Sequence, residues 1–203
     1  MIAVLDYGIG NLRSAEKALE HLGAPAVLTD DPAATKGARG VVLPGVGAFG
    51  ACMGALRSSG LDAVVRDAVE DGVPFLGICV GMQMLFEGSE EAPGVSGLGL
   101  FDGMVRRLPD TPGLKLPHMG WNTLEVREGS RLLAGLGDAP WMYFVHSYAP
   151  APDDESVVSG WSEYGGRLVA AVERGPVWAT QFHPEKSGAN GLALLANFVN
   201  ACQ

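Results

Sequence analysis

Short, nearly unbroken apolar runs alternate with amphipathic stretches in the first half of this chain. The runs predict strands, and apolar positions spaced by about 3.6 residues predict helices. In chain order the expected elements are a strand at 2–5, a helix at 12–22, strands at 27–29 and 40–43, a helix at 61–70 and a strand at 75–78. Strands that alternate with helices are typical of a parallel sheet covered on both faces.

The pattern changes after Gly94, where Gly and Pro become frequent and short alternating segments replace the longer apolar runs. These segments predict strands at 104–107, 123–126, 142–145, 157–161, 168–173 and 177–181. We expect parts of them to pair antiparallel, and we expect a last helix at 188–201. The predicted fold class is α/β, with a single domain over 1–203. That domain contains a mostly parallel open sheet, flanking helices and additional antiparallel strands in its second half.

The composition of the chain limits its possible size class, partners and location. A chain of 203 residues with 47% hydrophobic content can bury one full core. Its 23 acidic and 14 basic residues give a charge of −9 without any basic run, so we expect no nucleic-acid partner. No apolar run approaches the ~20 residues that cross a bilayer, and the N-terminus lacks the basic start of a signal peptide. We expect a cytoplasmic protein without a membrane partner that acts on a small metabolite.

Cysteine and histidine are sparse. The three cysteines, Cys52, Cys79 and Cys202, are irregularly spaced, which argues against a disulfide framework. The four histidines stand singly, and none has the spacing of a zinc site. We therefore expect no metal and no cofactor.

One cysteine lies in a pattern typical of a catalytic nucleophile. The segment Gly77-Ile78-Cys79-Val80-Gly81 follows an apolar run and precedes an apolar helical pattern, so it predicts a strand, a sharp turn and a helix. Small residues flank a nucleophile in such an elbow because the backbone passes close to itself. The start of the following helix also favours a thiolate. By itself the pattern is equally compatible with a small buried cysteine.

A histidine far along the chain favours the nucleophile over the small buried cysteine. His183 follows a predicted strand, and Glu185 lies two positions later, after a proline. In an extended segment these two side chains project to the same side, so Glu185 can hold one ring nitrogen while the other faces a thiol. Cys79, His183 and Glu185 then supply the nucleophile, base and orienting group of acyl transfer.

A glycine-rich segment follows the strand at 40–43. The amides of Gly45, Val46 and Gly47, together with that of Val80, are candidates for an oxyanion hole. The alternative is a phosphate-binding turn, but the segment has no Gly-Lys-Ser/Thr ending and no Gly-x-Gly-x-x-Gly pattern in register with a helix.

Together these segments resemble the class I, triad-type glutamine amidotransferases, and the resemblance covers essentially the whole chain. It is closest to the glutaminase subunits of imidazole glycerol phosphate synthase. The narrower resemblance rests on 6–11 (Asp-Tyr-Gly-Ile-Gly-Asn), 44–47 (Pro-Gly-Val-Gly), 117–122 (Pro-His-Met-Gly-Trp-Asn), 144–148 (Phe-Val-His-Ser-Tyr) and 181–187 (Gln-Phe-His-Pro-Glu-Lys-Ser).

The resemblance implies a chemistry. Cys79 would attack the side-chain amide of glutamine to form a γ-glutamyl thioester, His183 would protonate the departing ammonia and then activate water, and Glu185 would hold the ring. The residues that match glutamine-pocket positions of the family are Gln83, His146, Ser147 and Tyr148.

The resemblance also implies a partner. In the family the ammonia passes to a separate cyclase subunit, a (β/α)8 barrel. That heterodimer makes imidazole glycerol phosphate and an aminoimidazole carboxamide ribotide in histidine biosynthesis. Asn11, Trp121 and Lys186 match positions at the subunit interface.

Other readings of the sequence stay open. The chain could be the glutaminase of pyridoxal phosphate synthase or of anthranilate synthase, or a stand-alone thiol hydrolase of similar fold. We further hypothesise that the 45–47 segment turns its amides away from the oxyanion until the partner binds, because glycines permit a peptide flip at little cost.

Overall fold

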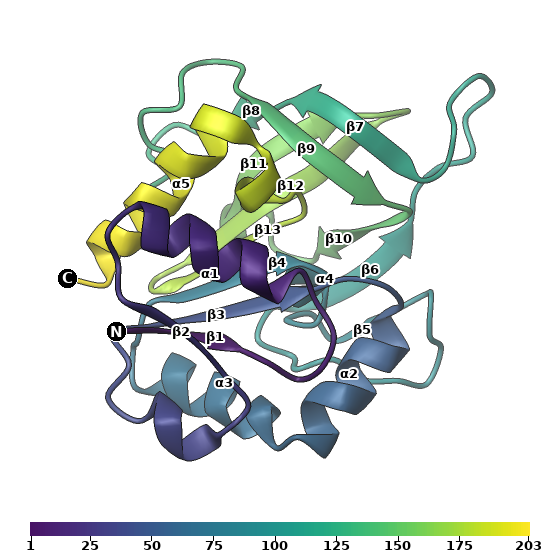
Figure 1. Ribbon diagram of the computed structural model, residues 1–203. Coiled ribbons are helices and arrows are strands. Elements are labelled where there is room, and N and C mark those ends of the chain that lie inside the picture. The colour runs from purple at the N-terminus through teal and green to yellow at the C-terminus, as the bar shows by residue number, and fades with distance from the viewer.

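The computed structural model describes residues 1–203 and has an eight-stranded sheet at its centre (Figure 1). In spatial order the strands are β2 (Ala26–Thr29), β1 (Ile2–Leu5), β3 (Gly40–Gly45), β4 (Phe75–Cys79), β13 (Val177–Thr180), β12 (Arg167–Arg174), β11 (Val158–Glu163) and β8 (Glu125–Val126). The first five are parallel, and β12, β11 and β8 continue the sheet antiparallel. The predicted fold class is confirmed.

Helices cover both faces of the parallel part. Helices α1 (Leu12–His21) and α5 (Gly188–Ala201) lie on one face, and α2 (Phe49–Ser58) and α3 (Leu61–Glu70) lie on the other (Figure 1). Each helix turns its apolar positions toward the sheet, and 50 buried residues form one continuous core. None of the helices combines the length and the apolar character that a membrane span requires.

Two smaller sheets complete the second half. One contains β10 (Tyr148–Pro152), β6 (Gly103–Arg107) and β5 (Gly88–Ser89). The other is an antiparallel ribbon of β7 (His118–Thr123) and β9 (Trp141–His146), called the β7–β9 ribbon below (Figure 1). Short 3₁₀ turns occur at η1 (Pro32–Thr35), η2 (Glu155–Val157) and η3 (Pro184–Lys186).

Most predicted elements are confirmed to within a residue or two, and four elements were missed, namely α2, β5, β7 and β10. Helix α2 has Gly and Ala among its apolar residues and shows no distinct polar stripe. Strand β10 contains two prolines, which a sheet accepts only at an edge, and β10 is the edge strand of its sheet. Strand β7 ends at Thr123, so the strand predicted at 123–126 is in fact the end of β7 followed by β8.

Candidate active site

Cys79 stands at a sharp turn between strand β4 and the one-turn helix α4 (Val80–Gln83). Its backbone has φ 57° and ψ −112°, and it is the only residue other than glycine with a positive φ. A Cβ added to Gly81 would lie 1.9 Å from the carbonyl oxygen of Leu43, and one added to Gly77 would lie 3.0 Å from that of Gly81. Gly81 therefore excludes a side chain and Gly77 leaves little room for one, which confirms the elbow geometry.

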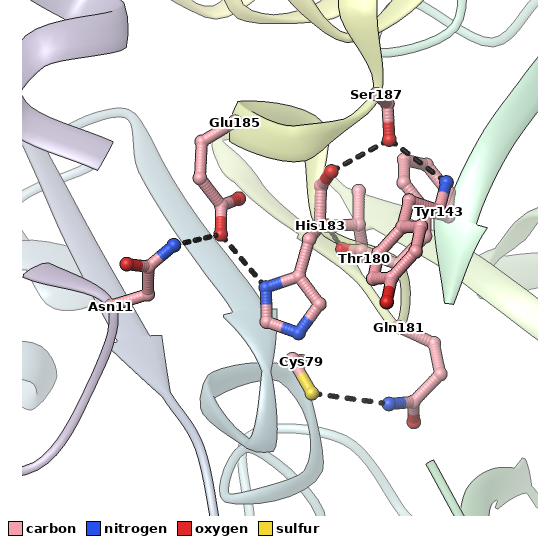
Figure 2. A network of polar contacts seen from close by, with 9 residues as sticks. Asn11, Cys79, Tyr143, Thr180, Gln181, His183, Glu185 and Ser187 are labelled. Atoms are coloured by element: carbon pink, nitrogen blue, oxygen red, sulfur yellow. Dashed lines mark hydrogen bonds and ion pairs between the residues drawn. The ribbon is translucent and has the colours of Figure 1, made fainter. Parts of the chain in front are cut away.

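His183 reaches the thiol because strand β13 runs parallel to its neighbour β4. Thr180 pairs with Ile78, so the residues that follow these two strands meet at the same edge of the sheet. Figure 2 shows the Nε2 side of the His183 ring facing the sulfur of Cys79. This Nε2 atom is buried and makes no well-aligned hydrogen bond within the protein, so it is available to a bound substrate.

Glu185 binds the other ring nitrogen of His183, with 2.8 Å between Oε1 and Nδ1. The predicted extended segment is wrong here, because residues Pro184–Lys186 form the 3₁₀ turn η3. Proline is well accommodated at the first position of such a turn. The hydroxyl of Ser187 fixes the turn by donating to the carbonyl of His183 over 2.6 Å. The imidazole and the carboxylate therefore meet around a turn instead of along a strand (Figure 2).

Burial and the neighbouring groups set the charges of this pair. Burial disfavours a charged ring, but the contacts with Cys79 and Glu185 outweigh it and raise the pKa of His183 to about 9. Burial also disfavours a carboxylate, yet the hydrogen bond and charge of His183, with the amide of Asn11, hold the pKa of Glu185 below its usual value. Near neutral pH the two side chains form an imidazolium and a carboxylate.

A cavity of about 290 Å³ opens beside the thiol. It brings together most of the predicted site residues, namely Val46, Gly47, Cys79, Val80, Gln83, His146, Ser147, Tyr148 and His183. A wider groove of about 780 Å³ between η1 and α3 is lined by neither cysteine nor histidine. The smaller cavity is therefore the candidate active site.

Comparison with known proteins identifies the family. The sequence matches the family described as Glutamine amidotransferase class-I over residues 3–202. The chain belongs to the class I glutamine amidotransferase family. Two curated relatives of this amidotransferase are each named imidazole glycerol phosphate synthase subunit HisH.

The relative from Deinococcus radiodurans is 53% identical over 198 residues, which covers 97% of this chain and 92% of that protein. The relative from Thermosynechococcus vestitus is 52% identical over 200 residues, covering 98% and 95%. A solved structure described as a glutamine amidotransferase has a TM-score of 0.77 and 25% identity, and covers 99% of this chain and 98% of that one. The similarity therefore extends over nearly the full length of the chain in both sequence and fold.

The glycine-rich segment of this amidotransferase differs in part from expectation. Gly45 is the last residue of strand β3 and does not line the cavity. A Cβ at Gly45 would lie 2.7 Å from the backbone nitrogen of Gly81, so Gly45 allows β3 to pack closely against the elbow. The loop proper begins at Val46, whose carbonyl accepts from the thiol of Cys52 over 3.2 Å. Gly45 is thus a close-packing position at the elbow, and its assignment to the oxyanion loop stays a prediction.

Sequence reasoning missed Gln181 in this amidotransferase. Its side chain is fully buried, and its Nε2 donates to the sulfur of Cys79 over 3.7 Å (Figure 2). Its Oε1 accepts from Nε2 of Gln83 over 3.0 Å. The available signal was its place in the Gln-Phe-His-Pro-Glu segment, at the end of the strand predicted at 177–181.

The three residues expected at a subunit interface lie in different environments. Trp121 is 53% exposed on the β7–β9 ribbon, beside the exposed side chains of Met119 and Trp141. Lys186 is exposed at the end of η3. Asn11 is half-buried and donates to Oε1 of Glu185 over 3.0 Å, so it also contacts the triad (Figure 2).

Proposed function

We propose that this protein hydrolyses glutamine to glutamate and ammonia and delivers the ammonia to a separate cyclase subunit. That subunit would form imidazole glycerol phosphate and an aminoimidazole carboxamide ribotide in histidine biosynthesis. The supporting observation is the meeting of Cys79 and His183 at one cavity, in a chain 53% identical to a HisH subunit. A nucleophile, a base and an orienting carboxylate are the groups that acyl transfer requires.

The first half-reaction forms a thioester. The sulfur of Cys79 attacks the side-chain carbonyl carbon of glutamine, and the negative charge moves to the carbonyl oxygen. The backbone N–H of Val80 and those of the 46–47 loop are the proposed donors to this oxyanion. The C–N bond then breaks, and His183 gives its proton to the departing nitrogen, which leaves as ammonia.

The second half-reaction releases glutamate. His183, now neutral, takes a proton from a water molecule whose oxygen adds to the thioester carbon. The C–S bond breaks, the sulfur leaves as a thiolate and glutamate is released. One glutamine and one water are consumed, and one glutamate and one ammonia are formed. Glu185 holds the ring in position in both steps and stabilises its charged form.

The remaining cavity residues are proposed to bind glutamine. Gln83, His146, Ser147 and Tyr148 line the cavity together with the loop residues Val46 and Gly47. The loop itself is proposed to switch activity by a peptide flip, because Gly47 has φ +89° and open space around its Cα. One oxyanion donor is worth about 10² to 10³ in rate, so a flip is sufficient to switch turnover.

The partner surface is proposed to include the exposed face of the β7–β9 ribbon. Met119, Trp121 and Trp141 are 63%, 53% and 55% exposed, and large exposed side chains that cluster in this way mark interaction surfaces. Lys186 follows the triad on η3 and adds a positive charge nearby. We propose a heterodimer with a (β/α)8-barrel cyclase. All three cysteines are free, which fits a cytosolic location.

Labelling with a diazo-ketone analogue of glutamine tests the proposal. The adduct is expected on Cys79, and labelling is expected to accelerate when the cyclase subunit and its substrate are present. In the complex, Cys79→Ala should abolish glutamine-dependent synthesis while added ammonium still supports it. Adduct on another residue, or an equal loss with ammonium, would contradict the proposal. Failure to complement the cyclase, with glutaminase activity intact, would point to another amidotransferase.

A further inference from the structure

Two buried histidines outside the triad share a hydrogen bond. His118 on β7 and His146 on β9 lie opposite each other in the β7–β9 ribbon and are 2% and 6% exposed. The Nδ1 atom of His118 is 3.0 Å from the Nε2 atom of His146. The His118 ring is stacked between Phe144 and Tyr164, with centroid distances of 4.7 and 4.0 Å. Packing therefore fixes the plane of this ring.

Asn122 fixes the proton positions at one end of the pair. Its Oδ1 accepts from the N–H of Thr123 over 2.8 Å, and its Nδ2 donates to the carbonyl of Glu163 over 2.9 Å, which settles the orientation of the amide. Nδ2 also lies 3.2 Å from Nε2 of His118. Nε2 of His118 must accept this hydrogen bond, so the proton of the neutral ring lies on Nδ1.

At the other end of the pair, the hydrogen bond of His146 requires the same donor-to-acceptor direction, from His118 to His146. The Nδ1 atom of His146 is 2.9 Å from the carbonyl oxygen of Tyr148, which can only accept. His146 therefore carries its proton on Nδ1 and offers the lone pair of Nε2 to the N–H of His118. Burial lowers the pKa of each ring to about 4, so both rings are neutral near pH 7. Every donor in this chain meets an acceptor.

The chain of hydrogen bonds continues to the nucleophile. Gln83 donates from Nε2 to the carbonyl of Tyr148 and to Oε1 of Gln181, each over 3.0 Å. Gln181 in turn donates to the sulfur of Cys79. Because both N–H groups of Gln83 are used inside the protein, only its Oε1 is free toward the cavity. That oxygen accepts, which suits the carboxamide N–H or the ammonium group of glutamine.

We propose that Asn122, His118 and His146 form a positioning relay whose fixed hydrogen-bond direction orients the glutamine pocket. The inference rests on the proposed glutaminase function and adds residues to it that touch neither the thiol nor the reacting carbon. The relay starts on β7, whose opposite face exposes Met119 and Trp121. It thus links the ribbon that we propose faces the cyclase with the pocket.

Nuclear magnetic resonance of the full chain tests the proposed hydrogen-bond direction from Asn122 through His118 to His146. Long-range ¹H–¹⁵N correlations near neutral pH are expected to show His118 and His146 neutral, both with the proton on Nδ1. In Asn122→Asp the new carboxylate only accepts, so His118 is expected to take a second proton on Nε2 and still donate from Nδ1. A proton on Nε2 of His146 in the wild type would overturn the proposal.

Steady-state kinetics test whether the relay affects glutamine binding. His118→Phe keeps the ring between its stacking neighbours and removes both hydrogen bonds. Leaving a buried acceptor unpaired costs enough that we expect KM for glutamine to rise about tenfold, with a smaller change in kcat. Asn122→Asp should raise KM by less than His118→Phe does, because the direction at Nδ1 is kept and only the hydrogen bond to the carbonyl of Glu163 is lost. Tyr164→Phe is the matched control, since it keeps the stack and lies outside the relay.

Two further readouts separate the outcomes. Alkylation of Cys79 by iodoacetamide needs no glutamine pocket, so its rate should be unchanged in His118→Phe; an equal loss there would indicate general damage and contradict the relay. Unchanged KM in His118→Phe would also contradict it. If His118→Phe does not fold, the proton positions in the wild type and the kinetics of Asn122→Asp test the relay instead.

A wild-type protein that does not hydrolyse glutamine would refute the proposed function, and the test of the histidine proton positions would remain valid.

Discussion

Asn11 donates a hydrogen bond from Nδ2 to Oε1 of Glu185 over 3.0 Å, although 174 positions separate the two residues. Asn11 begins helix α1, and Glu185 lies in the turn after β13, so the contact joins the first helix to the catalytic carboxylate (Figure 2). The same oxygen accepts from His183. Asn11 therefore helps to hold the carboxylate of the proposed triad in place.

Replacing Asn11 with Leu should weaken this arrangement. The amide lowers the pKa of Glu185, so its loss should raise that pKa and move the acid limb of the kcat/KM profile to higher pH. We expect kcat to fall about tenfold, as for a lost hydrogen bond to a charged group. The exposed Asn200 gives a matched control, Asn200→Leu, which should leave the profile in place. An unshifted acid limb in Asn11→Leu would contradict the assignment.

The elbow predicts a strong position dependence of Gly→Ala substitutions. In Gly81→Ala the new Cβ would meet the carbonyl oxygen of Leu43 at 1.9 Å, so we expect a loss of about 3 kcal/mol or more in the free energy of unfolding. Gly54→Ala is the matched control inside helix α2, where a Cβ meets nothing within 4 Å. It should stabilise the protein by about 0.5–1 kcal/mol. Urea denaturation measures both, and equal effects would contradict the geometry.

Stability should depend on pH in opposite directions on either side of about pH 6.5. The pKa of His183 is raised to about 9, so its stabilising contribution is complete below 6.5 and is lost as the pH rises through 9. The pKa values of His118 and His146 are lowered to about 4, so the unfolded rings bind protons first and stability falls as the pH drops from 6.5 toward 4.

Urea unfolding across this range measures both slopes. Each proton contributes up to about 1.4 kcal/mol per pH unit. Glu185→Gln should flatten the alkaline slope, and His118→Phe should reduce the acid slope and leave the alkaline slope unchanged. Because the pKa of Glu185 lies below its usual value, Glu185→Gln also removes a contribution that is lost at the acid end. If instead His118→Phe flattened the alkaline slope and Glu185→Gln alone reduced the acid slope, the assignment of the two slopes to these histidines would be wrong.

A substitution on the exposed face of the β7–β9 ribbon should affect binding of the cyclase much more than it affects the stability of the fold. Trp121 is 53% exposed, so Trp121→Ala should change the free energy of unfolding by no more than about 0.5 kcal/mol. If this face binds the cyclase, the same change should weaken the complex by about 2 kcal/mol or more, roughly thirtyfold in Kd. Val27→Ala, at a 41% exposed position on the edge strand β2, is the control and should bind normally. Calorimetric titration with the cyclase subunit decides between these outcomes.

Local pattern was sufficient for much of the fold and for the chemistry. Helices α3 and α5 begin and end where apolar spacing places them, because each buries a stripe defined by its own residues. The elbow at Cys79 was also predicted from a local pattern, although Gly81 is required by its contact with Leu43 on the neighbouring strand β3. Strand β10 was not visible in this way, because an edge position in a sheet makes its prolines acceptable.

What the sequence by itself determined is therefore the order of strands and helices, the nucleophile and the His-Pro-Glu motif. Only the tertiary structure decided that Asn11 contacts Glu185, that Gln181 donates to the thiol, and that two buried histidines share a hydrogen bond. The physical reason is that a hydrogen bond requires a fixed distance and angle between two groups. For residues far apart along the chain, the packing of whole strands and helices alone sets that distance.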